Sequence, residues 1–277
     1  MTKELKKIKE GISFLSLGTL VSNVFLFIKA ILLVRYFGAE NYGLLSLVLG
    51  LPILLELIIV NTDYYLVYRL PREIIKGGTG SDDRASLIIC SYIVKSLSVI
   101  FTSFILYFFS EEIATTIGYG NLISAIEIVA VVNLFKIIRG PLNIAVFNQF
   151  QKYSHSMISD FIDKLGYLLV AVISVSLNYS IEEYLILSIF AIVPVSIYNN
   201  FQLLIRRDYY LGKSFNIDLS KDLKEMITYS IPNTFRRQLD RYHGIIIRYI
   251  IGYLLNASSV GIITFVYNIY DLIWAVC

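Results

Sequence analysis

Long apolar stretches dominate this sequence and set the first limit on its fold. A helix needs roughly 20 apolar residues to cross the hydrocarbon core of a bilayer, which is about 30 Å thick. Eight stretches are that long, and they lie at about 12–36, 43–66, 85–109, 121–149, 157–178, 184–205, 227–255 and 259–277. We therefore expect an all-α fold, a polytopic bundle of about eight transmembrane helices.

The composition excludes several other classes of protein. Hydrophobic residues make up 56% of the chain and charged residues only 16%, and a soluble fold could not hide that much apolar surface. Two cysteines, Cys90 and Cys277, and two isolated histidines form neither a disulfide framework nor a metal site. The chain carries no phosphate-binding loop and no nucleophile motif. We therefore expect no enzyme activity, no catalytic residue, no cofactor and no nucleic-acid partner.

Basic residues mark every second connection between the spans. Of the 24 Lys and Arg residues, 14 lie in connections that alternate with connections holding none. The basic connections are 1–11, 67–84, 150–156 and 206–226. The connections without Lys or Arg are near 37–42, 110–120, 179–183 and 256–258. Because basic loops stay in the cytoplasm, we predict a multi-pass protein of the cell membrane with a cytoplasmic N-terminus.

The remaining basic residues lie within spans, where each charge costs roughly 2.5–3.5 kcal/mol on insertion scales. Such a side chain faces a water-filled path or a partner, or it reaches the headgroups by snorkelling. Snorkelling is the simpler interpretation for Arg35, Arg139 and Lys164, which lie near span ends, and for Lys136 if its span ends near Pro141. The candidate cations of a substrate path are Lys29, Arg35, Lys95, Arg236, Arg237, Arg241 and Arg248.

Fewer acidic residues lie deep in the spans. The candidates for binding a coupling H⁺ or Na⁺, or for ion pairs, are Glu56, Glu127, Asp240 and Asp271. Glu56 could instead neutralise Lys29 or Lys95. Asp63, Asp160 and Asp163 lie near cytoplasmic span ends, where water is close. The deep cations outnumber the deep acids, and this excess favours an anionic passenger such as a phosphate or pyrophosphate.

Helical periodicity places several of these charges on narrow polar stripes. On the first span the stripe consists of Gly11, Gly18, Ser22, Lys29 and Tyr36. On the third span it consists of Ser91, Lys95, Ser98 and Thr102. On the seventh span Arg237, Arg241 and Arg248 share one face, and Asp240 can neutralise part of that charge. Tight helix packing explains the small residues of the first stripe, but it does not explain the lysine among them.

Two distant segments of the chain resemble each other. Each ends a helix with Arg-Tyr, passes a short connection and restarts at glycine; one runs from Arg35 to Gly43 and the other from Arg248 to Gly261. This echo indicates a parallel repeat six helices apart, as in transporters with two similar halves. We therefore predict a six-helix lobe over 1–205, a cytoplasmic connecting segment over 206–226 with a surface helix near 219–225, and the first two helices of a second lobe over 227–277.

At these residues the sequence resembles the Wzx-type polysaccharide flippases of the multidrug/oligosaccharidyl-lipid/polysaccharide exporter superfamily. The matching pieces are LVRYFG at 33–38 with YG at 42–43, YSIP at 229–232, DR at 240–241 and VG at 260–261. Members of this family carry twelve to fourteen helices, so we expect this chain to be a fragment of such a protein. A native eight-helix protein that dimerises is the alternative.

The resemblance implies two lobes around a central cavity that works by alternating access. The implied passenger is an oligosaccharide on a polyprenyl phosphate or pyrophosphate, with membrane lipids, a coupling H⁺ or Na⁺ and polysaccharide-assembly proteins as further partners. Two other functions stay open. One is a cation-coupled multidrug exporter of the same superfamily, which should show an acid-rich cavity, and the other is a membrane scaffold that transports nothing.

Overall fold

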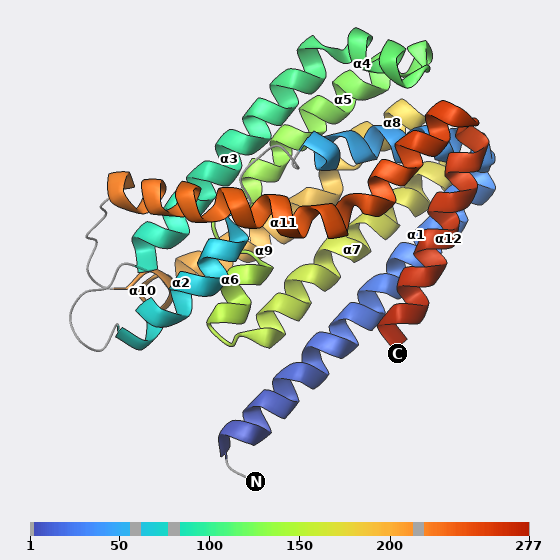
Figure 1. Cartoon of the computed structure of the whole chain (residues 1–277). Helices are drawn as coiled ribbons and strands as arrows, with labels where there is room; N and C mark the ends of the chain where they lie inside the picture. Colours follow the sequence, from blue (N-terminus) through green and yellow to red (C-terminus); the bar gives the residue numbers. More distant parts are fainter. Residues whose placement is uncertain (1–2, 56–61, 77–83, 213–218, 277) are drawn as a thin grey trace.

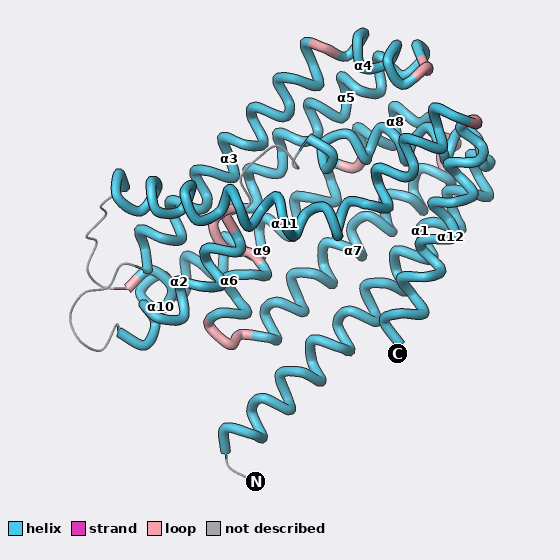
Figure 2. Tube along the Cα trace, viewed as in Figure 1, coloured by secondary structure: helices cyan, strands magenta, loops and turns pink. Residues whose placement is uncertain are grey.

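The computed structural model of the chain describes residues 3–55, 62–76, 84–212 and 219–276. Within those ranges, the side chains of 3–15, 219–221, 233–242 and 274–276 lie outside the description. Every element in the described ranges is helical, as Figure 2 shows. The predicted all-α membrane bundle is therefore confirmed.

The first helix, α1 (Lys3–Leu55), bends sharply at Gly38 into two arms. Gly38 has φ 76° and ψ 168°, a backbone conformation that residues with a Cβ avoid. The first arm covers the first predicted span, and the second arm starts at residue 39 without the loop that we expected over 37–42. A single glycine thus replaces a whole connection and joins the two arms at a corner.

The rest of the chain folds into helices of very different lengths. The middle of the chain forms α2 (Asp63–Lys76), α3 (Arg84–Phe108), α4 (Ser110–Ile117), the 3-10 turn η1 (Gly120–Leu122), α5 (Ile123–Leu134), the 3-10 turn η2 (Phe135–Arg139) and α6 (Ile144–Gln149). It continues with α7 (Tyr153–Ser176), α8 (Ile181–Leu187), α9 (Ile189–Ile205), α10 (Arg207–Leu211), α11 (Leu219–Leu254) and α12 (Ala257–Val276).

Four helical stretches of the described chain are long and apolar enough to cross a membrane. They are Ser16–Leu55, Arg84–Phe108, Gly120–Gln149 and Ile181–Ile205, and two shorter apolar helices follow at His243–Leu254 and Ala257–Ile273. Helix α7 covers the predicted fifth span but carries Asp160, Asp163 and Lys164 along its length. Those three charges lie within a helix that the sequence predicts to span the membrane.

The predicted fourth span is not one continuous helix. It ends as η2 at Arg139, and Gly140 then adopts a positive φ of 78° before Pro141. Proline lacks the backbone N–H that would continue a helix, and Asn143 starts α6 by accepting a hydrogen bond from the Val146 N–H at 3.0 Å. Backbone chemistry at Gly140 and Pro141 therefore divides the span close to its basic end.

The segment near 219–225 is a helix that leads into the predicted seventh span, as expected, but it is partly buried and does not lie wholly on the surface. It forms the first turns of α11, which continues without a break to Leu254. Asp222 and Met226 are buried, and the Ser86 hydroxyl of α3 donates a hydrogen bond to Asp222. The charged residues that suggested a surface location are therefore accompanied by buried residues that fix this part of α11 against α3.

The connections gather at two opposite ends of the bundle, in the order that the basic residues predict. At one end the Tyr119 hydroxyl donates to the Gly252 carbonyl at 3.0 Å, and the Tyr36 hydroxyl donates to the Tyr179 carbonyl at 3.2 Å. At the other end Arg84 donates to the Tyr209 carbonyl at 3.4 Å. We call the first of these the acidic end and the second the basic end. The acidic end lies at the upper right of Figure 1 and the basic end at the lower left.

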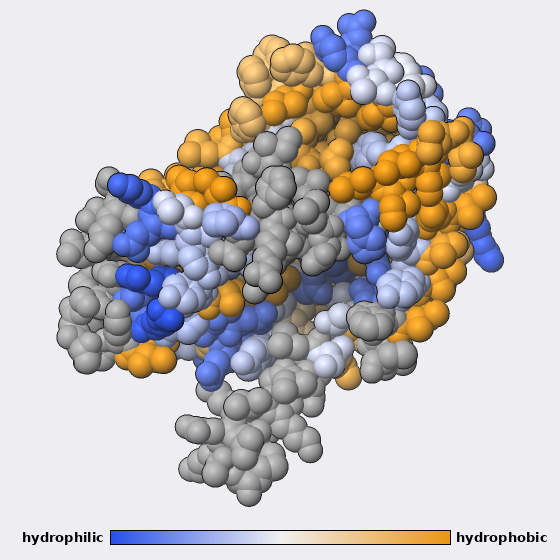
Figure 3. All heavy atoms as spheres, viewed as in Figure 1, coloured by the Kyte–Doolittle hydropathy of each residue, from blue (hydrophilic) through white to orange (hydrophobic). Residues whose placement is uncertain are grey.

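The outer surface of the bundle is apolar, as lipid contact requires. On α3, Leu97, Phe101, Phe104 and Phe108 are all more than half exposed and fall on one face. Figure 3 shows hydrophobic residues over the flanks, with hydrophilic residues in the centre of this face and at the basic end.

Candidate functional site

The polar stripe on the first arm of α1 faces α7. Gly18 lies against the side chain of Met157, the Ser22 hydroxyl donates to the carboxylate of Asp160, and Lys29 Nζ lies 5.6 Å from the ring centroid of Tyr167. The stripe therefore combines both interpretations of the sequence. Its small residues permit close packing, and its lysine reaches a polar region of α7.

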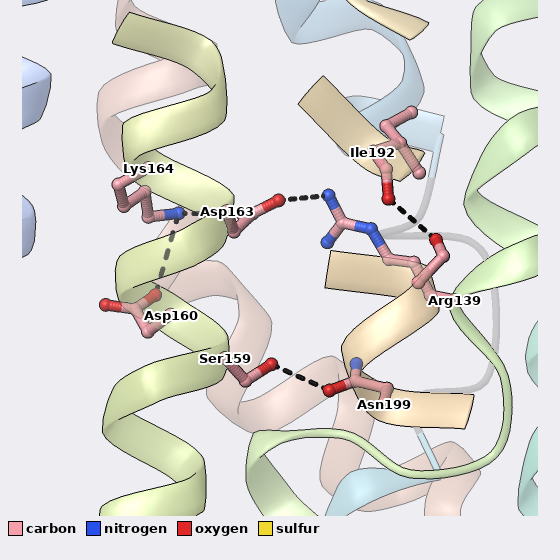
Figure 4. A network of polar contacts seen from close by, with 8 residues as sticks. Arg139, Ser159, Asp160, Asp163, Lys164, Ile192 and Asn199 are labelled. Carbon is pink, nitrogen blue, oxygen red and sulfur yellow. Dashed lines mark hydrogen bonds and ion pairs between the residues drawn. The ribbon is translucent and has the colours of Figure 1, made fainter. Parts of the chain in front are cut away.

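On α7 that polar region is a charged group on one helix face. Lys164 Nζ lies 3.4 Å from Asp163 Oδ2 and 3.9 Å from Asp160 Oδ1. Arg139, from η2, donates through Nη2 to Asp163 Oδ1 at 2.6 Å, and Figure 4 shows the guanidinium pointing at this carboxylate. Together with Lys29 these residues form what we call the α7 cluster: Lys29, Arg139, Asp160, Asp163 and Lys164.

The α7 cluster is only partly shielded from water. The side chain of Asp163 is 12% exposed, and those of Asp160, Lys164 and Arg139 are 24–32% exposed. Asp163 lies ten residues into α7, which is roughly 15 Å along the helix. Charges at that depth in a membrane bundle are stable where they line a water-filled cavity and pair with one another. With three cations against two carboxylates, the cluster has one positive charge in excess.

Arg139 is held in place through the backbone of η2. The Asn200 side chain donates to the Ile138 carbonyl at 2.9 Å, and the Tyr92 hydroxyl donates to the Ile137 carbonyl at 2.8 Å. A Cβ on Gly140 would overlap the Asn200 side chain. Two helices, α3 and α9, thus fix the turn that aims the guanidinium at α7.

Lys95 lies in a separate ion pair. It contacts the carboxylate of Asp63 at the start of α2, and one turn earlier on α3 Ser91 shares a hydrogen bond of 2.7 Å with Thr62. The predicted stripe on the third span therefore faces residues 62–63. Asp63 therefore pairs with this lysine, and the predicted alternative partner Glu56 lies outside the described residues.

Four other predicted residues are described outside the α7 cluster. Glu127 accepts a hydrogen bond from Ser110 at 3.2 Å, whereas Arg35 and Asp271 are exposed. Arg248 lies with its guanidinium 5.9 Å from the ring centroid of Tyr267. No carboxylate of the described residues lies within ion-pair distance of Arg248.

The side chains of the remaining predicted residues lie outside the described part of the chain. Glu56 lies outside the described residues, and so do the side chains of Arg236, Arg237, Asp240 and Arg241, although α11 passes through their positions. Of the four candidate cations whose side chains are described, the structure brings Lys29 into the α7 cluster.

The sequence reasoning missed the other members of the cluster. It assigned Arg139 and Lys164 to snorkelling and Asp160 and Asp163 to water near a span end. One signal could have found them, because Asp160, Asp163, Lys164 and Tyr167 follow the spacing i, i+3, i+4, i+7 of a single helix face.

The two echoed segments meet at their glycines. A Cβ on Gly43 would overlap the Ala257 carbonyl, and a Cβ on Gly261 would overlap the Ala39 carbonyl. Each alanine lies four residues before its glycine, so the contact is reciprocal. Nearby, the Tyr249 hydroxyl donates to the Leu47 carbonyl at 2.5 Å. We call this contact between the second arm of α1 and α12 the glycine seam.

The described part of the chain holds no group of three His, Cys, Asp or Glu side chains that could bind a metal ion. Cys90 is a buried free thiol. In the described ranges, the chemistry of the site is therefore that of fixed charges, hydroxyls and aromatic rings.

Comparison with known proteins gives one match. A family model described as "Polysaccharide biosynthesis protein" matches residues 8–276, nearly the whole chain. No curated protein and no solved structure matches it.

Proposed function

This chain belongs to the polysaccharide biosynthesis protein family, and we propose that it forms all or part of a flippase for a lipid-linked oligosaccharide. The cargo is a sugar chain on a polyprenyl phosphate or pyrophosphate, moved from the cytoplasmic to the outer leaflet of the cell membrane. The family and the apolar helices establish a multi-pass membrane protein related to polysaccharides. The cargo and the direction are our proposal.

The observation that carries the proposal is the positive excess of the α7 cluster inside an apolar bundle. Lys and Arg donors in a site of low dielectric bind phosphate oxygens more strongly than they do in bulk water. Arg139 and Lys164 both donate to the carboxylate of Asp163. A phosphate that enters the cluster would compete with Asp163 for these two donors. The cluster can therefore bind the anion by exchanging partners, and it can release it in the same way.

The proposed orientation follows from the two ends of the bundle. The basic end faces the cytoplasm and the acidic end faces outward, because basic loops are retained inside. The glycine seam closes the bundle towards the acidic end, and the cargo enters from the basic end. We assign residues 1–205 to one lobe and 227–277 to the beginning of a second, so that the seam is a contact between lobes.

The alternative of a cation-coupled drug exporter predicts an excess of acidic groups along the path. The described charges of the α7 cluster have the opposite excess, which favours an anionic cargo. Coupling to H⁺ or Na⁺ is compatible with either function, and the predicted acids Glu56, Glu127, Asp240 and Asp271 stay candidates for it. A scaffold without transport predicts that neutralising the cluster changes nothing.

The test is glycan export in a host that lacks its own flippase, with this chain in its native full-length protein. We expect Lys29→Gln and Lys164→Gln each to lower export about tenfold, because a hydrogen bond to a charged group contributes about 1.5–3 kcal/mol. Arg237→Ala with Arg241→Ala tests the cations predicted on α11. The matched control is Lys152→Gln, whose lysine lies at the basic end 4.9 Å from the Tyr209 ring.

Protein amount in the membrane is measured for every variant, and export is compared at equal amounts. Normal export by Lys29→Gln and Lys164→Gln would contradict the cationic path, and equal loss in Lys152→Gln would show a general effect of charge.

A further inference from the structure

A second polar site lies at the acidic end, away from the α7 cluster. It is an open pocket of about 540 Å³ between the Gly38 bend of α1 and the turn that precedes α8. Its lining includes Tyr36, Asn41, Asn178, Tyr179 and Glu182. Tyr36 ends the polar stripe of the first span, but the family match does not point to this pocket.

Aromatic rings form one part of the lining, and the ring of Tyr36 is held in position. The Tyr36 hydroxyl donates to the Tyr179 carbonyl at 3.2 Å, which ties the end of the first arm to the turn before α8. The Tyr36 ring also contacts Phe37 edge-on, at 4.9 Å between centroids and an angle of 61°. Tyr36 and Tyr179 are each half-buried. The fixed Tyr36 ring can thus offer apolar surface to a ligand with little loss of rotational freedom, and Tyr179 contributes a second half-buried ring.

Polar groups form the other part of the lining, and some of them have no hydrogen-bond partner among the described residues. Ser180 and Glu183 bond to each other's backbone in a capping box at the start of α8, so their side chains are occupied. The side chains of Asn41, Asn178 and Glu182 make no hydrogen bond within the described residues. Two amides and a carboxylate beside aromatic rings can donate and accept several hydrogen bonds at once.

The charge of the pocket restricts its ligand. No Lys or Arg is among the described residues that line it, whereas Glu182 and Glu183 are both present. A phosphate or a uronic acid would therefore meet negative charge without a cation to balance it. A ring with many hydroxyls, one apolar face and no negative charge fits this lining.

We propose that this pocket is a carbohydrate subsite that binds uncharged sugar rings of the cargo at the outer face. The statement that the sugar belongs to the cargo rests on the proposed function, but the binding of sugar to the pocket does not. The protein then binds the two parts of its cargo at different sites, because the α7 cluster binds the phosphate and the pocket binds the sugar. The subsite also gives the protein a preference for neutral over acidic glycans.

The experiment measures binding of soluble trisaccharides to the whole chain in lipid nanodiscs by saturation-transfer NMR. The probes are tri-N-acetylchitotriose, which is neutral, and tri-galacturonate, which is acidic. We expect the neutral trisaccharide to receive saturation and the acidic one to receive none. Tyr179→Ala should lower the signal about fivefold, because it removes an aromatic contact, and Asn178→Ala with Glu182→Gln should lower it as well.

The matched control is Tyr253→Ala, which removes a tyrosine 73% exposed near the same end but outside the pocket. An unchanged signal in Tyr179→Ala, a stronger signal from the acidic trisaccharide, or displacement of the neutral one by glycerophosphoethanolamine would overturn the subsite. Because no transport is measured, these results are independent of export by Lys29→Gln. If the neutral trisaccharide binds but the Lys29→Gln and Lys164→Gln variants export normally, the subsite is supported and the phosphate path is contradicted.

Discussion

Helix α1 packs against two partners by different physical means. Against α7 it uses side chains that carry charge or hydroxyls, and the contact stays partly open to water. Against α12 the two backbones touch at Gly43 and Gly261, and side-chain contacts such as the hydrogen bond from Asn268 to the Tyr42 hydroxyl accompany them. Lipid supplies no hydrophobic force between helices, so a membrane bundle relies on close packing and polar pairs, and the two contacts of α1 combine these in different proportions.

This difference separates the contact that a ligand can enter from the contact that it cannot. Ions and water can exchange partners within the α7 cluster, whereas the glycine seam leaves no space for an added methyl group. We infer that the contact between α1 and α7 recognises the ligand and that the contact between α1 and α12 fixes the shape of the bundle. The two contacts should therefore respond to different changes.

The largest expected effect is at the glycine seam. Gly43→Ala places a methyl group on the Ala257 carbonyl, and overpacking of this kind lowers the free energy of unfolding by about 1–3 kcal/mol or more. Thermal unfolding of the purified protein in detergent measures the change. The control is Gly120→Ala, because nothing lies within 4 Å of a Cβ at Gly120. Equal stability of the two variants would remove the distinction between the contacts of α1.

A smaller effect is expected at the ion pair between Arg139 and Asp163. Removing either partner leaves the other charge less well paired, so Asp163→Asn and Arg139→Gln should each lower the free energy of unfolding by about 1–2 kcal/mol. Both side chains are partly exposed, which keeps the values below those of fully buried pairs. Denaturation of both single variants and of the double variant measures the coupling between them. Additivity within about 0.5 kcal/mol would show that the pair acts as two independent residues.

The smallest effect is a pH dependence at the basic end of α7. His155 Nε2 accepts a hydrogen bond from Arg206 at 2.9 Å, so its neutral ring carries the proton on Nδ1, which lies 2.8 Å from the Tyr198 hydroxyl. Burial, followed by the charges of Arg206 and Lys152, lowers the pKa of His155 below its ordinary 6.5. The unfolded chain therefore takes up this proton first as the pH falls.

The stability that His155 contributes is accordingly complete above pH 6.5 and is lost as the pH falls towards the lower pKa of the folded state. We expect less than about 1 kcal/mol from this partly exposed group. Unfolding curves between pH 5 and 8 (about the range in which histidine titrates) measure it, with His155→Gln as the control that should flatten the profile. An unchanged profile in that variant would assign the pH dependence to another group.

The sequence predicts the helical membrane bundle well because span length and the placement of basic loops are local properties. It also predicts the stripe with Ser22 and Lys29, since helical periodicity fixes which residues share a face. The partners of that stripe are a different matter. The pairs of Lys95 with Asp63 and of Arg139 with Asp163 depend on how distant helices lie side by side, and distance from a span end does not reveal this.

Backbone detail is the second part that sequence reasoning missed. Gly38 and Gly140 both adopt positive φ, yet one joins two arms of a helix without a loop and the other ends a 3-10 turn. The residue type allows both outcomes, and the packing around each site decides between them. The echo between Arg35–Gly43 and Arg248–Gly261 identified two similar segments but did not predict that their glycines touch.

The glycine seam also sets an order of events during synthesis. Gly43 and Gly261 are 218 residues apart in the chain, so at about 5–20 residues per second the ribosome adds Gly261 roughly 10–45 s after Gly43. Helix α7 is complete well before that time. The nascent chain can therefore form the charged contact between α1 and α7 first. The glycine face of α1 stays in contact with lipid until α12 has been synthesised.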